Sequence, residues 1–458
     1  MKKIEIKYLF FVPLIYLSFL LFHKFLFVNI MTLDIGNKGG QGAAGLPLLL
    51  LSIIIAILII CYFFRCIRMD VYKKSFLYLF VYFCYFALRI LIDTQNTQTL
   101  KTYTIATTGG IILYYGLGVL FGLLIFLLHN IQFDFRISIK YRAVLFFVYL
   151  MINLFSIMGC FSSVSSIVRV DILGLEGGAN YQRIGNFLIM NTVLLSLLYF
   201  NNFIYLMHIR FLFKKLYLIF IFFAYFVYSV LIIVFSQLVG SNNGFVTCCG
   251  VLFLSVSLHI FIFILQKTKF VLLYRIKLRS FFRGGAFSKF LKSILISLLF
   301  LLFSIVAVVL KLGIDISKMR IFGYGESSTG LGSLTSRFEL LSNFYTHFSV
   351  SPFWGCVNAD VITTGDGTYV HSFILSMLTH MGILGFGVFV VFFIQAMFEY
   401  FYKDFNLYDA YKAVYEIFLL LGVGTIAIIA VFFTWVPIWF LFGLLFKPLK
   451  IVKLPLRW

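Results

Sequence analysis

Residues that can carry chemistry are few in this 458-residue chain, because only 12% of its residues are charged. A charged or titratable side chain beside a long apolar stretch is costly, so each one is a candidate functional group. His371 stands where a polar stretch ends and an apolar run begins. A neutral imidazole there could take a proton from a hydroxyl group, although a single histidine at an interface also serves as a polar anchor.

Three arginines stand at similar boundaries, and a guanidinium group can bind an anion with two parallel hydrogen bonds. Arg89 comes four residues before Asp93, so a helical ion pair is the alternative to a functional role. Arg183 lies where a polar segment returns to an apolar one, and its alternative is contact with lipid phosphate. Arg337 follows Ser336 at the start of an expected helix. Each of the three is a candidate for binding an anion.

The elements that position these residues are apolar helices. The chain is 62% hydrophobic and contains 60 phenylalanines, far more than a soluble core requires. Its apolar runs lack the alternation of barrel strands, and a bilayer crossing takes roughly 20 helical residues. We therefore predict an all-α polytopic membrane protein with about 12 transmembrane helices, in which residues 1–458 form a single integral membrane domain. The expected crossings are 8–30, 46–64, 75–93, 105–128, 143–163, 184–206, 217–237, 245–265, 293–310, 371–398, 413–433 and a short one at 436–446.

The distribution of basic residues predicts the orientation. If both termini are cytoplasmic, 27 of the 37 lysines and arginines fall in cytoplasmic segments and 8 fall in external loops. Two external loops are long, at 163–183 and 313–370. The second is too polar for lipid and too long for a simple connection, so we expect it to fold over the membrane surface and to carry function.

Composition also excludes several classes. The net charge of +21 is spread over the ends of the apolar segments, which argues against nucleic-acid binding. The seven cysteines are scattered, so neither disulfides nor a metal site is expected. The glycine-rich segments 36–45 and 323–332 lack the Lys-Ser/Thr ending of a phosphate loop. No cofactor and no metal is predicted.

A series of short motifs runs through the second loop and into the apolar run after it. They are Ser336-Arg337, a helix, Pro352 to Gly355, a polar stretch, His371, and an apolar helix with Gly382 to Gly385. This order resembles the O-antigen polymerase and ligase group. The layout is also similar, with about twelve crossings, cytoplasmic termini and a larger second external loop.

The resemblance implies a metal-independent, inverting glycosyltransferase in the bacterial inner (cytoplasmic) membrane, with its active site facing the periplasm. The loops 163–183 and 313–370 would then be periplasmic. The donor would be an oligosaccharide linked to undecaprenyl diphosphate, held by Arg183, Arg337 and Arg89, while His371 would orient or deprotonate the acceptor hydroxyl. Membrane lipid is a further partner, and a chain-length regulator and a flippase are candidate protein partners.

Alternatives remain within and outside this family. Ligases often carry Ser-Arg-Gly after the seventh crossing, whereas Ser236 to Gly244 contains no arginine, which favours the polymerase. The polymerase would transfer the growing glycan to a newly flipped lipid-linked repeat unit, and the ligase would transfer finished glycan to a lipid A core sugar. A flippase or other transporter for lipid-linked oligosaccharides is the alternative from another class. It would line the bilayer midplane with charges and would not need a large external loop.

Overall fold

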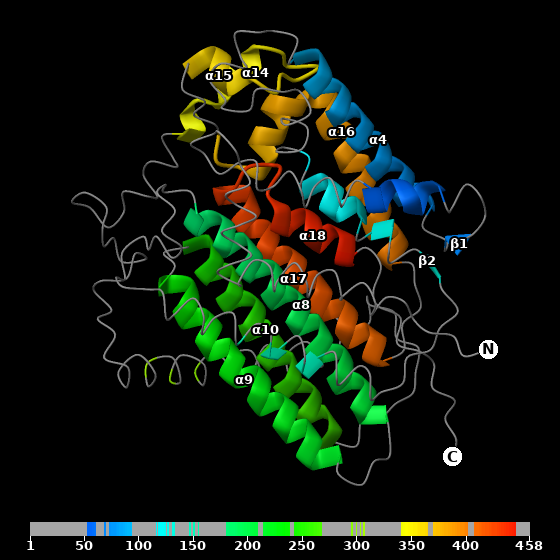
Figure 1. Ribbon diagram of the computed structural model, residues 1–458, viewed down its shortest axis with the longest axis vertical. Coiled ribbons are helices and arrows are strands. Elements are labelled where there is room, and N and C mark those ends of the chain that lie inside the picture. The colour runs from blue at the N-terminus through cyan, green and yellow to red at the C-terminus, as the bar shows by residue number, and fades with distance from the viewer. Residues whose placement is uncertain are drawn as a thin grey trace.

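The computed structural model of the protein describes nine continuous stretches and some shorter pieces (Figure 1). The stretches are 53–60, 68–69, 73–93, 180–208, 214–238, 242–267, 340–364, 370–401 and 407–445, with further short pieces between 116 and 154 and single positions between 295 and 306. Arg337 and the predicted crossing 8–30 lie outside the described residues.

Most of the described chain is helical, and its long helices coincide with predicted crossings. The helices are α4 (Lys73–Asp93), α8 (Asn180–His208), α9 (Lys214–Leu238), α10 (Asn242–Lys267), α16 (Phe373–Phe401) and α17 (Leu407–Ala430). Three segments are long and apolar enough to cross a membrane, namely Lys74–Asp93, Leu216–Ser236 and Phe373–Tyr400. The total of about twelve crossings stays a prediction.

Helices α8, α9, α10 and α17 form a bundle in which α10 contacts the other three (Figure 1). Small polar side chains and tyrosines join the helices at buried positions. Ser196 of α8 lies 2.6 Å from the hydroxyl of Tyr225 on α9, and that ring stacks on Tyr199 with centroids 4.1 Å apart. Apolar side chains contact lipid as favourably as they contact another helix, so hydrogen bonds of this kind help to determine which helices pair.

Helices α4 and α16 form a second, antiparallel pair (Figure 1). Near the start of α4, the Ser75 hydroxyl donates to Glu399 near the end of α16 at 2.5 Å. Further along, the ring of Tyr85 covers Gly385 so closely that a Cβ atom there would lie 2.7 Å from the ring. The pair brings the end of α4 at Asp93 to the segment around Gly382.

Helix α16 is two helical arms joined at Gly382, whose φ of 65° and ψ of −178° are not helical. In one straight helix, Phe373 and Phe389 would be about 24 Å apart. Their ring centroids are instead 5.6 Å apart, so the chain folds back on itself at Gly382. The single crossing predicted at 371–398 is therefore corrected to a short arm, Phe373 to Met381, and a long arm, Ile383 to Phe401. Glycine occupies the break because residues with a side chain almost never adopt this backbone conformation.

Helix α18 (Val436–Leu445) has ten residues, about 15 Å of helix and half the apolar thickness of a bilayer. It follows α17 after the turn 431–435 and enters the core, where Trp439 is fully buried against Phe373 and Phe389. A Cβ atom at Gly122 would lie 2.6 Å from the Trp439 carbonyl oxygen. The twelfth crossing expected at 436–446 is thus, over its described residues, a half-length helix that packs inside the bundle.

The described part of the second long loop is folded, as expected from its length. It contains α14 (Phe344–Ser349) and α15 (Ala359–Thr364), which contact each other beside α16 at one end of the molecule (Figure 1). That this loop is periplasmic stays a prediction. Two short strands, β1 (Arg68–Met69) and β2 (Ile131–Gln132), pair antiparallel elsewhere.

Candidate functional site

The loop between α14 and α15 is bonded into the break of α16. Because the helix stops at Gly382, the next two amide groups lack helical partners, and they donate to the loop instead: Ile383 N to the Pro352 carbonyl at 3.0 Å and Leu384 N to the Phe353 carbonyl at 3.1 Å. In the other direction, Cys356 N donates to the Thr379 carbonyl at 3.2 Å. The Pro352 to Gly355 and Gly382 to Gly385 motifs are therefore one structural unit.

A row of polar side chains on α4 fixes the other side of the same loop. Tyr85, Arg89 and Asp93 recur every four residues and so lie on one helix face. The Tyr85 hydroxyl donates to the Trp354 carbonyl at 2.6 Å. Arg89 pairs with one carboxylate oxygen of Asp93, and the other oxygen accepts a hydrogen bond from Val357 N at 2.7 Å. The ion pair between Arg89 and Asp93, which was the alternative to anion binding by Arg89, is present, and it also holds the loop.

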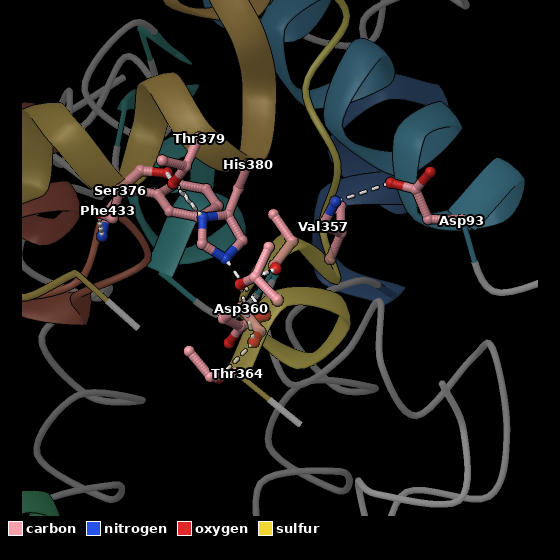
Figure 2. Close-up of polar contacts among 10 residues, drawn as sticks. Asp93, Val357, Asp360, Thr364, Ser376, Thr379, His380 and Phe433 are labelled. Atoms are coloured by element: carbon pink, nitrogen blue, oxygen red, sulfur yellow. Dashed lines mark hydrogen bonds and ion pairs between the residues drawn. The ribbon is translucent and has the colours of Figure 1, made fainter. Parts of the chain in front are cut away.

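These bonds bring Asp360 of α15 to His380 on the short arm of α16 (Figure 2). Oδ1 of Asp360 lies 3.8 Å from Nε2 of His380, and the side chains are 2% and 0% exposed. A carboxylate this deeply buried needs a nearby positive charge or proton, because burial strongly disfavours an isolated charge. The imidazoles of His380 and His347 both interact electrostatically with Asp360.

The contacts of the other ring nitrogen fix where His380 carries its first proton. Nδ1 lies 2.8 Å from the Ser376 carbonyl oxygen, which can only accept a hydrogen bond. Nδ1 is therefore protonated, and it also lies 2.8 Å from the Thr379 hydroxyl. Nε2 therefore faces the Asp360 carboxylate across 3.8 Å, a distance longer than a hydrogen bond. Neither Nε2 nor Oδ1 has a hydrogen-bond partner among the described residues.

Aromatic rings cover this pair from the α17–α18 turn. Phe432 and Phe433 have ring centroids 4.8 Å and 5.6 Å from that of His380. Phe433 N donates to the Ser376 hydroxyl at 2.9 Å, which fixes the turn on the short arm (Figure 2). The rings exclude water and so strengthen the electrostatic contact beneath them.

His347 of α14 adds a second buried histidine to this cluster. It is fully buried, and neither ring nitrogen has a hydrogen-bond partner among the described residues. Burial lowers the pKa of His347, opposed by the nearby charge of Asp360, while His380 lowers it further. His347 is therefore held as the neutral imidazole. In the described part of the chain, no group of three His, Cys, Asp or Glu side chains could hold a metal ion.

No family model, no curated protein and no solved structure matches this chain. The site must accordingly be interpreted from its own geometry.

Of the predicted site residues that the structure describes, only Arg89 is shown to take part in attaching the loop at the helix break. His371 is half-buried just before the short arm of α16, at the end of that arm remote from Gly382. Nine positions separate it from His380, which corresponds to about 14 Å along a helix axis. Because the helix is broken at Gly382, His371 does not lie where it would lie at the start of one straight helix. Arg183 lies in the first turn of α8, and its side chain is outside what the structure describes.

The sequence interpretation missed His380, Asp360 and His347. His380 lies inside an apolar run, and Asp360 lies inside the long loop. Neither residue stands at a boundary between a polar and an apolar segment, as His371 and Arg183 do. One signal was present: His380 precedes Gly382 by only two residues, and a titratable residue beside a helix break is a candidate site in a membrane protein. Its partner, however, came from contacts that no local pattern contains.

Proposed function

We propose that the protein is an O-antigen polymerase, which moves a growing glycan from undecaprenyl diphosphate to the sugar of a newly flipped, lipid-linked repeat unit. The observation that supports it best is the bonding of Pro352 and Phe353 to the break at Gly382. The two motifs on which the family resemblance rests thereby form one unit. That unit carries a buried carboxylate and imidazole and is attached to Arg89 through Asp93.

The chemistry suits the residue types. In a direct displacement, the acceptor oxygen bonds to the anomeric carbon, the bond to the diphosphate oxygen breaks, and the configuration inverts. Guanidinium groups stabilise the charge that builds on the leaving diphosphate, the role proposed for Arg183, Arg337 and Arg89. The hydroxyl proton passes to a base, the role proposed for His371, and general bases typically contribute about 10² to 10⁴ in rate.

The Asp360–His380 pair has a positioning role in this proposal. His371 comes two residues before the short arm that carries His380, so packing of the loop against His380 also limits the position of the loop relative to His371. Catalytic groups need such support, since small displacements from the reactive geometry cost much of the rate.

The test uses the purified full-length protein in liposomes, with lipid-linked repeat units extracted from cells that lack its gene. The wild type should produce a ladder of products, and His371→Ala and Arg183→Ala should leave single repeats at near-normal protein levels. His208→Ala, at the other end of α8, and Arg210→Ala, two residues later in the sequence, are matched controls and should keep the ladder. Ladders from both site variants would remove those residues from the site. Absence of a ladder with the wild type would refute the polymerase.

A transporter of lipid-linked oligosaccharides is the second candidate, because α16 is discontinuous and carries a buried histidine at its break. Discontinuous helices with titratable groups are typical of secondary transporters. Liposomes that display repeat units in both leaflets distinguish the two functions. A polymerase extends the units there, whereas a transporter forms no glycosidic bond. Addition of a lipid A core acceptor in the same assay would reveal a ligase.

A further inference from the structure

The turn 351–356 carries two large aromatic side chains at the molecular surface. Phe353 is 51% exposed and Trp354 is 54% exposed, and their rings pack edge to face with centroids 5.0 Å apart. No charged residue occurs from Phe348 through Ala359, which is unusual for a long polar loop. An exposed apolar patch of this kind indicates an interaction surface.

The patch is continuous with the exposed faces of two candidate membrane helices. The Trp354 carbonyl accepts from Tyr85 of α4, and the Phe353 carbonyl accepts from Leu384 of α16. Leu88 and Ile92 lie on the same face of α4 as Tyr85 and are 52% and 50% exposed. Beside the bonded Leu384, Ile383 of α16 is 51% exposed. If lipid covers these two helices, the same lipid reaches the turn.

The carbonyl groups of the turn are also paired, as an apolar environment requires. Its four successive carbonyls from Ser351 to Trp354 all accept hydrogen bonds, from Gly355 N at 2.8 Å, Ile383 N at 3.0 Å, Leu384 N at 3.1 Å and the Tyr85 hydroxyl at 2.6 Å. Pro352 has no amide proton to satisfy. In water an irregular turn needs no such pairing, whereas in lipid every unpaired backbone group costs several kcal/mol.

We propose that the turn 351–356 is immersed at the edge of the bilayer, with Phe353 and Trp354 in direct contact with lipid. Tryptophan and other amphipathic rings favour this depth, where one side of the ring meets acyl chains and the other meets headgroups. The loop is then anchored to the membrane as well as to α4 and α16. The proposed contact of the turn with lipid does not depend on which reaction the protein catalyses.

The experiment measures fluorescence from the full-length protein in liposomes made of ordinary phospholipids or of phospholipids brominated on their acyl chains. The difference between the wild type and Trp354→Phe isolates the emission of Trp354, since the variant keeps the other tryptophans and the backbone bond of residue 354. Trp354 should lose most of its emission in brominated lipid and little on addition of iodide to the water. Loss to iodide without loss to bromine would overturn the proposal and would favour a surface that binds soluble glycan.

Two further variants keep the test decisive. Phe353→Trp combined with Trp354→Phe moves the reporter by one residue and should reproduce the quenching by brominated lipid. Tyr345→Trp combined with Trp354→Phe places the reporter on α14, where residue 345 is 80% exposed. That reporter should respond to iodide. Equal quenching by brominated lipid at both positions would show that bromine does not discriminate the turn, and would also overturn the proposal.

Discussion

Gly355 and Gly382 face each other so closely that a Cβ atom on either would lie under 3.0 Å from the backbone of the other. Both have positive φ values, 77° and 65°, which side chains rarely allow. One glycine belongs to the loop and the other to the helix break, so their contact is where the loop enters α16. This contact positions Asp360 beside His380.

Gly382→Ala should destabilise the protein strongly. The backbone strain alone is worth about 1 to 3 kcal/mol, and overpacking against Gly355 adds about 1 to 3 kcal/mol. Thermal unfolding in detergent, followed by loss of the monodisperse peak in size-exclusion chromatography, measures the change. Gly387→Ala is the matched control on the long arm, where a Cβ atom meets nothing within 4 Å. It should be neutral or slightly stabilising, and equal losses in both variants would contradict the role of the contact.

Asp360→Asn and His380→Gln should show strong energetic coupling. Each single variant leaves one buried polar group without the electrostatic partner that faces it, while the double variant removes both groups. We expect a coupling free energy of about 1 to 3 kcal/mol in a double-mutant cycle of unfolding. Single effects that simply add would mean that the 3.8 Å contact carries no energy.

Stability should fall as the pH drops through the ordinary pKa of histidine, partly because of His347. Burial holds the pKa of His347 below its ordinary value of about 6.5, so the unfolded chain binds more protons than the folded one below that pH. The folded state then loses stability as the pH falls from 6.5 towards the lowered pKa, and keeps the full contribution above 6.5. His347→Gln should have a shallower stability profile between pH 7 and 5 in the same unfolding assay. An unchanged slope would show that His347 does not titrate differently on folding.

Cys356 should resist thiol reagents although it lies in the long loop. Its side chain is 7% exposed, and burial raises the pKa of the thiol to about 11, so very little thiolate exists at pH 8. Tyr345→Cys, at a position that is 80% exposed, should instead react readily. Mass spectrometry after maleimide treatment in detergent compares the two. Rapid modification of Cys356 in the folded wild type would contradict the packing of the loop.

The same Tyr345→Cys variant tests the predicted orientation in intact cells. A membrane-impermeant maleimide should label it from outside the cytoplasmic membrane, because the distribution of basic residues predicts that the loop 313–370 lies on that side. Arg210→Cys, in a predicted cytoplasmic segment, should be labelled only after the membrane is opened. Labelling in the reverse order would invert the topology and would remove the lipid-linked substrate from reach of the loop.

The sequence by itself determined approximately where the long helices α4, α8, α9, α10 and α17 lie along the chain. This follows from local composition, because a long apolar run must form a helix in lipid. The spacing of Arg89 and Asp93 also offered their ion pair as the alternative to anion binding, since residues four apart are neighbours on any helix.

Only the tertiary structure decided that α16 folds back at Gly382 and that Asp360 meets His380. An apolar run that contains a glycine has the same periodicity whether it is straight or broken. The break becomes stable because Pro352 and Phe353, some thirty residues earlier, accept the amide protons that it releases. The spacing of residues within one segment does not predict hydrogen bonds to a distant segment. The site therefore depends on contacts that form only when the loop and the helix fold together.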